Sequence, residues 1–310
     1  MRIAYLEPFE RAWERMKLAL FRPFDLHKWC VVGFNAFLAG LAESRNGSAS
    51  WRGRSHMTFR EFLDLPDRGW EWLTGHPGWF VAIGFVAAVV IAVGIVLLWL
   101  SSRGKFMFLD NVIHSRAEIA KPWREFQKEG DSLFLWRLVF GFICLAIFAA
   151  FAVFFFVGAR QLYDVGFGRR MPVLFLVGMG LAFLLLLIII AYVSLFLNDF
   201  VVPIMGKDRI STVAGWRRFL PLLGHHPFHF ILYGIIIFLL YLLFVIIVIV
   251  AGLVTCCIGW LILVIPYIGT VVTLPIWYTF RAYSLEFLAQ FGPEYVVFPA
   301  PAAQPETPPA

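Results

Sequence analysis

Long unbroken apolar runs are the feature that most constrains what this chain can fold into. Segment 172–197 contains the run LAFLLLLIIIAYVSLFL, which has no charged residue. A bilayer has a hydrocarbon core of about 30 Å and needs about 20 apolar residues in a helix that crosses it. Only 15% of the residues are charged and 61% are apolar, whereas about a quarter of a soluble domain is charged. We therefore expect an integral membrane protein.

Six segments have the length or hydropathy expected of a membrane crossing. A helix is the element that satisfies every backbone group within one segment in lipid, so all six are predicted to be helices and the fold class is all-α. The first segment is the weakest, because Asp25, His27 and Lys28 interrupt its start. The expected transmembrane helices are 24–41, 79–100, 133–157, 172–197, 228–254 and 258–280.

The distribution of Lys and Arg predicts the orientation. If the N-terminus is cytoplasmic, the inner segments carry about 18 of the 26 Lys and Arg residues. Short cytoplasmic loops of membrane proteins carry this excess of positive charge. We expect a multi-pass protein with both termini in the cytoplasm. Positive charge beside apolar runs also accounts for the net charge of +6, so no nucleic-acid partner is predicted.

The long loop between the first two segments, residues 43–78, is expected on the outer side. Thr58 and Glu61 have the spacing of a helix capping box. Tryptophans 51, 70, 72 and 79 are typical of the headgroup level of a membrane. The pattern favours an interfacial helix, and a lid with a functional role is the alternative. The Pro- and Ala-rich tail, residues 292–310, is expected to be disordered.

The sequence resembles itself at a shift of 93 residues. The connector PWREF, which contains Trp123 and Arg124, corresponds to GWRRF, which contains Trp216 and Arg217, and AWERM near the N-terminus is a fainter copy. The pattern predicts one integral membrane domain, residues 1–291, with repeat units at about 1–100, 101–200 and 201–291. Each unit would be a cytoplasmic amphipathic helix at the interface followed by a transmembrane hairpin, so the three hairpins would form parallel repeats.

Acidic residues recur where the even-numbered helices end. FLDN contains Asp110, FLND contains Asp199 and SLEFL contains Glu286. We expect these acids to form structural ion pairs with arginines of neighbouring units, since oppositely charged groups at helix ends fix the packing of hairpins. The candidate arginines are Arg15, Arg124 and Arg217. A proton or ion relay is the alternative, although such a relay needs ionisable groups deep in the bilayer.

The sixth segment is the best candidate for a binding site. IPYIGTVVTLPIWYTFRAY places two prolines and a glycine within ten residues, and an interrupted helix exposes backbone carbonyls to a substrate. Arg281 would meet a lipid phosphate. Simple proline kinks are the alternative. The candidate substrate- or lipid-binding residues are Pro266, Gly269, Thr270, Pro275 and Arg281.

No pattern in the chain predicts catalysis, a cofactor or a metal. Phosphate-binding loops, nucleophile elbows and HExxH are absent from the sequence, so no catalytic residue is assigned. His225 and His229 share one helical face, but Pro227 lies between them and interfacial histidines are the favoured interpretation. Cys256 and Cys257 are interpreted as small apolar residues at a turn between helices rather than as a redox or metal pair.

The connectors PWREF and GWRRF, together with the ending IPYIGTVVTLPIWYTFRAYSLEFLAQFGPEY, resemble a family of uncharacterised bacterial six-helix membrane proteins. They are distantly similar to the membrane domain of glycerophosphodiester phosphodiesterases. The resemblance extends to Tyr295 and implies a bacterial inner (plasma) membrane location. The phosphodiesterase catalytic domain is absent, so the resemblance implies no functional residues.

Two functional hypotheses follow from the sequence. The first is a non-catalytic structural or accessory subunit that self-assembles or packs against other membrane-protein subunits in lipid, because its helices are long, apolar and rich in glycine and aromatic residues. The second is a transporter, or a protein that binds or translocates lipid, with its site at the interrupted sixth helix.

Overall fold

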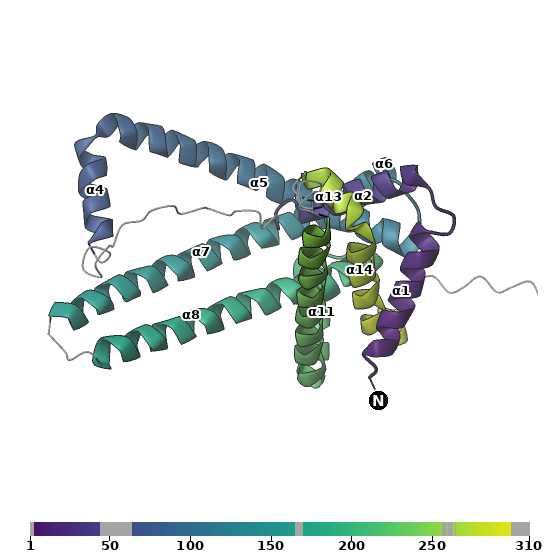
Figure 1. Ribbon diagram of the computed structural model, residues 1–310. Helices are drawn as coiled ribbons and strands as arrows, with labels where there is room; N and C mark the ends of the chain where they lie inside the picture. The colour runs from purple at the N-terminus through teal and green to yellow at the C-terminus, as the bar shows by residue number, and fades with distance from the viewer. Residues whose placement is uncertain are drawn as a thin grey trace, which may run out of the picture. The chain divides into compact units, whose positions relative to one another are not determined.

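Helices make up the regular structure of this protein, apart from one isolated β-bridge between Phe21 and Phe24. The computed structural model describes residues 3–43, 64–164, 170–255 and 265–298, together with residues 259 and 263 (Figure 1). Among these residues, four helices are long and apolar enough to cross a membrane. They span Pro77–His114, Gln127–Leu162, Val173–Asp208 and Pro227–Val254.

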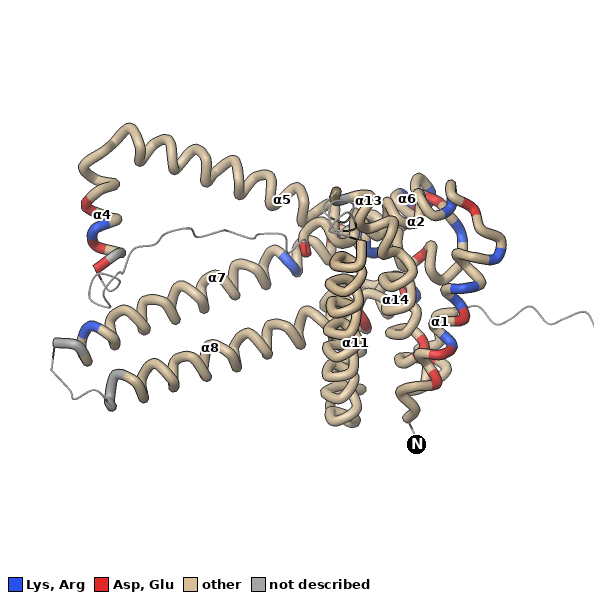
Figure 2. The backbone as a smooth tube through the Cα atoms, viewed as in Figure 1, with Lys and Arg blue, Asp and Glu red and all other residues tan. Residues whose placement is uncertain are grey.

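The chain divides into two compact units, and three of its long helices contribute residues to both. Unit 1 consists of residues 1–41, 99–136 and 194–310, and unit 2 consists of residues 42–98 and 137–193. The long helices have extended stretches that carry no charge (Figure 2). Helix α5 has no charged residue between Pro77 and Ser102, and its charge begins at Arg103.

Unit 2 is built from apolar helices. Helix α4 (Leu65–Gly75) precedes α5 (Pro77–His114), and the chain continues through α7 (Gln127–Asp164) and α8 (Arg170–Phe196). Helices α7 and α8 meet through phenylalanine rings, since Phe148 and Phe151 each lie within 6 Å of Phe183. Gly158 leaves room for Phe175, whose ring would lie 2.9 Å from a Cβ at that position. This contact is typical of close helix packing in membranes.

In unit 1, helices α1 (Leu6–Leu20) and α14 (Leu274–Ala289) run antiparallel, side by side (Figure 1). The Tyr5 ring stacks on Phe287, and Phe9 meets Tyr283 edge to face, both with centroids 5.8 Å apart. Beyond the start of α1, the backbone N–H and carbonyl of Ala4 bond to the Gln290 side chain, each at 2.9 Å. These contacts join the two ends of the described chain.

Helix α2 (Leu26–Gly40) packs on α13 (Pro266–Val272). Asp25 caps the start of α2 by accepting a hydrogen bond from the His27 amide at 2.8 Å. The helices approach closely at Gly33, where a Cβ would lie 2.6 Å from Val271. The Tyr267 hydroxyl donates to the Cys30 carbonyl at 3.0 Å. This contact and that at Gly33 join residues more than 230 positions apart in the sequence.

The remaining helices of unit 1 surround a cluster of aromatic rings. Phe200 is fully buried, and its ring centroid lies 5.3 Å from Phe219, 5.0 Å from Phe230 and 4.9 Å from Tyr233. A similar stack joins Phe106 and Phe126 at 5.7 Å. The elements are α6 (Ala120–Glu125), the π-helix η1 (Leu197–Val201), α9 (Val202–Asp208), α10 (Thr212–His225), α11 (Pro227–Val254) and the 3-10 helix η2 (Pro293–Tyr295).

Six membrane crossings are not confirmed, because the first and sixth expected segments differ from the other four. Helix α2 has 15 residues, which corresponds to about 22 Å at 1.5 Å per residue and is shorter than a bilayer core. The sixth segment is divided at Thr273 into α13 and α14. Pro275 follows this break, and a proline amide cannot donate to the preceding helical turn. The three repeat hairpins are likewise not confirmed.

Several expected features lie outside the described residues. They are the capping box of Thr58 and Glu61, Trp51, the pair Cys256 and Cys257, and the tail from residue 299 onward.

Candidate functional site

Unit 1 buries charged side chains at the ends of the apolar helices. Lys105, Asp110, Glu129 and Glu286 are each less than 9% exposed. Charged side chains are almost never this buried unless they have partners. The partners of these residues therefore determine the chemistry that this region can perform.

The π-helix η1 forms a hub between three helices of unit 1. The Lys105 ammonium of α5 donates to the Asn198 side-chain carbonyl, and Nη1 of Arg281 on α14 donates to the Asn198 backbone carbonyl at 2.5 Å. Pro203 follows η1 and has no amide hydrogen for the carbonyl four residues earlier. A π turn shifts the hydrogen-bond register and frequently occurs at functional sites.

Asp199 lies beside this hub and binds α11. Its Oδ2 accepts a hydrogen bond from the Tyr233 hydroxyl at 2.9 Å. The Tyr233 ring stacks on Tyr283 with a centroid distance of 5.4 Å, and both rings are fully buried. The Tyr283 hydroxyl has no hydrogen-bond partner among the described residues. Burial raises the pKa of the Tyr283 phenol, so it remains protonated near neutral pH.

Glu286 joins α14 to α1. Its Oε1 lies 2.6 Å from Nε of Arg15, and its Oε2 lies 3.7 Å from Arg11. The arginines are 43% and 51% exposed, whereas Glu286 is 6% exposed. The buried carboxylate thus receives two partly hydrated arginines, which fix α1 against α14.

Asp110 pairs with residues other than the arginines expected from the sequence. Both carboxylate oxygens accept hydrogen bonds from Nη2 of Arg116, at 2.9 and 3.0 Å. The His114 ring lies 3.0 Å from Oδ1 of the same carboxylate. Both partners follow Asp110 within six residues, so this ion-pair cluster closes the end of α5.

Two asparagines hold the connection between α5 and α6. Asn111 donates to the Glu118 carbonyl at 3.0 Å and accepts from the Glu118 amide at 3.1 Å. Asn35 of α2 donates to the same carbonyl at 3.2 Å. The backbone of the connection is thereby fixed by side chains of two helices.

The two other expected arginines, Arg124 on α6 and Arg217 on α10, have exposed side chains. Of the six residues expected to form ion pairs, the structure brings together Glu286 and Arg15, while Asp110 and Asp199 contact the groups described above. The recurrence of an acidic residue at helix ends in the sequence identified these three acids as candidates. Their main partners, Arg116 and Tyr233, and the hub residues Lys105 and Asn198 carry no such signal.

The interrupted sixth segment satisfies two of its own carbonyls. The Gly269 carbonyl accepts from the Thr273 amide at 3.0 Å and from the Thr273 hydroxyl at 2.8 Å. The Pro275 carbonyl accepts from the Thr279 hydroxyl at 2.7 Å. At Gly269 a Cβ would lie 2.5 Å from the Leu263 carbonyl oxygen. Pro266 begins α13 and Thr270 lies within it, whereas Pro275 is the second residue of α14.

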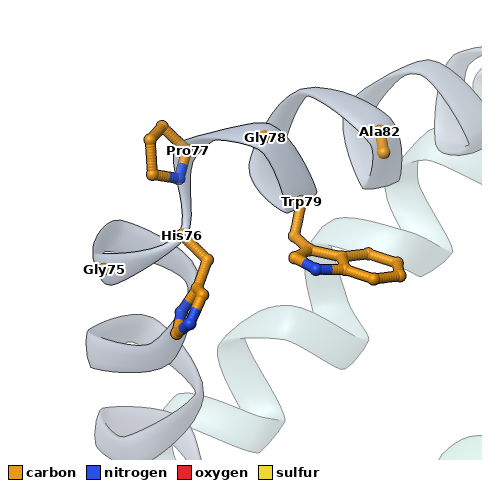
Figure 3. Close-up of a pocket in the computed structure, with 6 residues that line it drawn as sticks. All are labelled: Gly75, His76, Pro77, Gly78, Trp79 and Ala82. Atoms are coloured by element: carbon orange, nitrogen blue, oxygen red, sulfur yellow. The ribbon is translucent and has the colours of Figure 1, made fainter.

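A shallow hollow of about 470 Å³ lies where α4 meets α5 in unit 2. Figure 3 shows His76 and Trp79 projecting into the angle between the helices, with Pro77 on the outside of the turn. Trp72 of α4 stacks on His76 at 5.1 Å. Trp70, Trp72 and Trp79 are exposed, and such rings suit the membrane interface.

His226 and His229 contact aromatic rings. His226 lies 5.6 Å from Phe291, and His229 lies 6.3 Å from Tyr5. Within the described ranges, no group of three or more His, Cys, Asp or Glu side chains is placed to hold a metal ion.

The helices and the buried polar residues define an all-helical membrane protein that gathers its charged residues at the ends of apolar helices. The chain belongs to DUF7544, a family of unknown function, whose sequence profile matches residues 4–298. No curated protein and no solved structure matches the chain. Similarity to the phosphodiesterase membrane domain and bacterial origin stay predictions.

Proposed function

We propose that this protein is a non-catalytic accessory subunit of a membrane complex. It assembles laterally in the membrane with copies of itself or with other membrane proteins. One observation supports the proposal most directly. The most apolar 18-residue windows of α5, α7 and α8 contain no buried residue, and that of α11 is 6% buried. Lipid or other helices must cover these surfaces, since the described residues leave them exposed.

Glycines in the membrane-spanning helices favour coverage of these surfaces by partner helices rather than by lipid alone. A Cβ at Gly84, Gly94, Gly141, Gly178 or Gly180 would meet no atom of the residues that the structure describes within 4 Å. Small residues at a helix surface allow a second helix to approach closely, and van der Waals packing of this kind drives association in lipid. These five positions are the expected contact points of a partner helix.

The proposal includes the predicted orientation and repeat. An even number of crossings would keep both termini on one side, and the Lys and Arg distribution favours the cytoplasm as that side. The bacterial inner membrane is proposed from the resemblance to bacterial membrane proteins. The stacks of Phe106 on Phe126 and of Phe200 on Phe219 support the repeat. The two stacks correspond to each other at this interval, since Phe106 and Phe200 are 94 residues apart and Phe126 and Phe219 are 93 residues apart, near the repeat interval of the sequence.

Native mass spectrometry of protein extracted gently from its own membranes tests the assembly. We expect an oligomer or a complex with another subunit. Gly94→Leu should weaken the association about tenfold, equivalent to about 1.4 kcal/mol, because the added side chain fills the space at the helix surface. Gly224→Leu is the matched control, since Gly224 is equally open but lies on α10, outside the four spans. A wild-type protein that is monomeric and carries no partner would refute the proposal.

Lipid binding at the interrupted segment is a second candidate. It is favoured by the division of this segment into two short helices, which leaves Thr270 and Arg281 on separate elements. Thr270→Val removes a hydroxyl at nearly constant volume. Loss of co-purifying lipid in this variant would support the second function, and unchanged lipid retention would refute it.

A further inference from the structure

A cleft of about 430 Å³ opens in unit 1 beside the ion-pair cluster of Asp110. The end of α5, helix α6 and the end of α9 surround it. Leu109, Ile113 and Phe126 form an apolar part of its lining. The cleft thus combines an apolar wall with charged groups.

Lys and Arg outnumber Asp and Glu in the lining, four to two, and His114 also lines the cleft. Two of the basic residues are arginines held by the acids. Arg116 binds Asp110, and Nη2 of Arg209 lies 3.8 Å from Glu125. The Arg209 guanidinium also lies over the Phe126 ring at 3.8 Å. These contacts fix the two guanidinium groups at the edge of the cleft.

The other two basic residues are lysines that have no carboxylate partner among the residues that the structure describes. Lys207 donates to the backbone carbonyl of Glu294, which is neutral. Lys121 is exposed and forms no ion pair with any residue that the structure describes. The cleft therefore holds two ammonium groups that form no ion pair with a carboxylate of the described ranges.

The backbone on both sides of the cleft has unusual geometry. Ser115 and Arg209 have φ angles of 49° and 55°, in the left-handed region that few residues other than glycine adopt. Ser115 directly precedes Arg116, so each strained residue positions an arginine of the cleft. Strain of this kind concentrates at functional sites, where the surrounding structure maintains it.

We propose that this cleft binds a phosphate group through Lys121 and Lys207, with Arg116 and Arg209 held at its edge by their acids. Ammonium and guanidinium groups are the usual ligands of phosphate. The group belongs either to an anionic lipid headgroup or to a soluble phosphate, and the apolar wall accommodates the attached carbon atoms in both cases. This inference goes beyond the proposed accessory function and does not depend on it.

A helix-capping role is the competing explanation for the basic residues. Helices α5 and α9 end at the cleft, and cations stabilise the negative ends of helices by about 0.3–1 kcal/mol. Capping alone predicts that removing the lysines lowers stability without changing phosphate binding. The two explanations therefore differ in a binding measurement.

The test uses the full chain in a neutral detergent and in nanodiscs. Calorimetric titration with inorganic phosphate measures the soluble form, and native mass spectrometry after reconstitution with phosphatidylglycerol measures the lipid form. The double variant Lys121→Ala/Lys207→Ala should reduce binding at least tenfold in one of the two measurements. Lys128→Ala/Arg217→Ala is the matched control, since it removes two exposed charges outside the cleft.

Each outcome decides the proposal. Selective loss of phosphate binding supports a soluble ligand, and selective loss of retained phosphatidylglycerol supports a lipid headgroup. Equal binding by the two double variants, or no binding by the wild-type protein to either probe, overturns the proposal. Lys121→Arg, which keeps the charge, should retain binding, and circular dichroism confirms that each variant is folded.

Discussion

Similar residues have different surroundings in the two units, and helix α5 shows this contrast within a single element. At Gly104, in unit 1, a Cβ would lie 2.7 Å from the backbone of Leu38 and Ala39. At Gly94, ten residues earlier in unit 2, a Cβ would meet nothing within 4 Å. Several glycines of unit 1 bring helices of the chain together, whereas most glycines in the spans of unit 2 contact no atom of the described residues.

The same contrast holds for polar groups. Unit 1 buries Asp110, Asn111 and Glu286 with partners supplied by other parts of the unit. In unit 2, Arg160 and Asp67 form a pair at 2.5 Å in which the side chains are 37% and 63% exposed. Specific polar contacts define the packing of unit 1, because an unpaired buried charge is costly. The apolar surface of unit 2 does not require specific polar partners in this way.

The largest expected effect comes from comparing the same substitution, glycine to alanine, at two positions of α5. Gly104→Ala should lower the free energy of unfolding by about 3 kcal/mol, because the methyl group would overlap backbone atoms of α2. Gly94→Ala should change it by less than about 1 kcal/mol, since alanine favours a helix and meets no atom of the chain. Thermal and denaturant unfolding in detergent measure both. Equal destabilisation by the two variants would contradict the contrast between the units.

Removing the buried acid at the end of α5 should have a smaller effect. Asp110→Asn removes the charge from the three hydrogen bonds that Asp110 accepts from Arg116, and it should cost about 2 kcal/mol. The control is Asp131→Asn, because Asp131 pairs with Arg103 but is 51% exposed. That variant should cost less than about 1 kcal/mol. If the control is the more destabilising variant, burial does not determine the strength of these pairs.

The smallest expected effect is the difference in stability between variants of the two stacked tyrosines. Tyr233→Phe removes the donor to Asp199 and should cost about 1 kcal/mol. Tyr283→Phe removes a buried hydroxyl that has no partner among the described residues, so stability should stay constant or rise slightly. Unfolding of both variants under one set of conditions makes the comparison. A larger loss at Tyr283 would show that its hydroxyl has a partner beyond those residues.

The sequence predicted the four long helices, whereas the first and sixth crossings stay predictions. The apolar runs at 79–100, 133–157, 172–197 and 228–254 all lie within membrane-length helices. These runs carry enough apolar residues to determine a helix locally. The first segment ends at Gly40 after 15 residues, and the sixth contains a break at Thr273. Hydropathy averages over such breaks, so it does not detect where a helix stops.

The candidate site was accessible to sequence reasoning only in part. The recurrence of an acid at helix ends identified Asp110, Asp199 and Glu286 as residues of interest. It could not identify Lys105 and Asn198 as partners, because they lie 93 residues apart and meet only when two helices pack. Arg281 was expected to meet a lipid phosphate, and the structure shows its Nη1 bound to the Asn198 carbonyl.

The sequence by itself determined that this protein is helical and belongs in a membrane, because long apolar runs with few charges satisfy their backbone only as helices in lipid. It also placed the charged residues at the ends of those helices. The tertiary structure decided which charges pair, where glycines allow helices to touch, and that two lysines in a cleft have no carboxylate partner among the described residues. These properties depend on distances between residues remote in the chain, which helix packing alone determines.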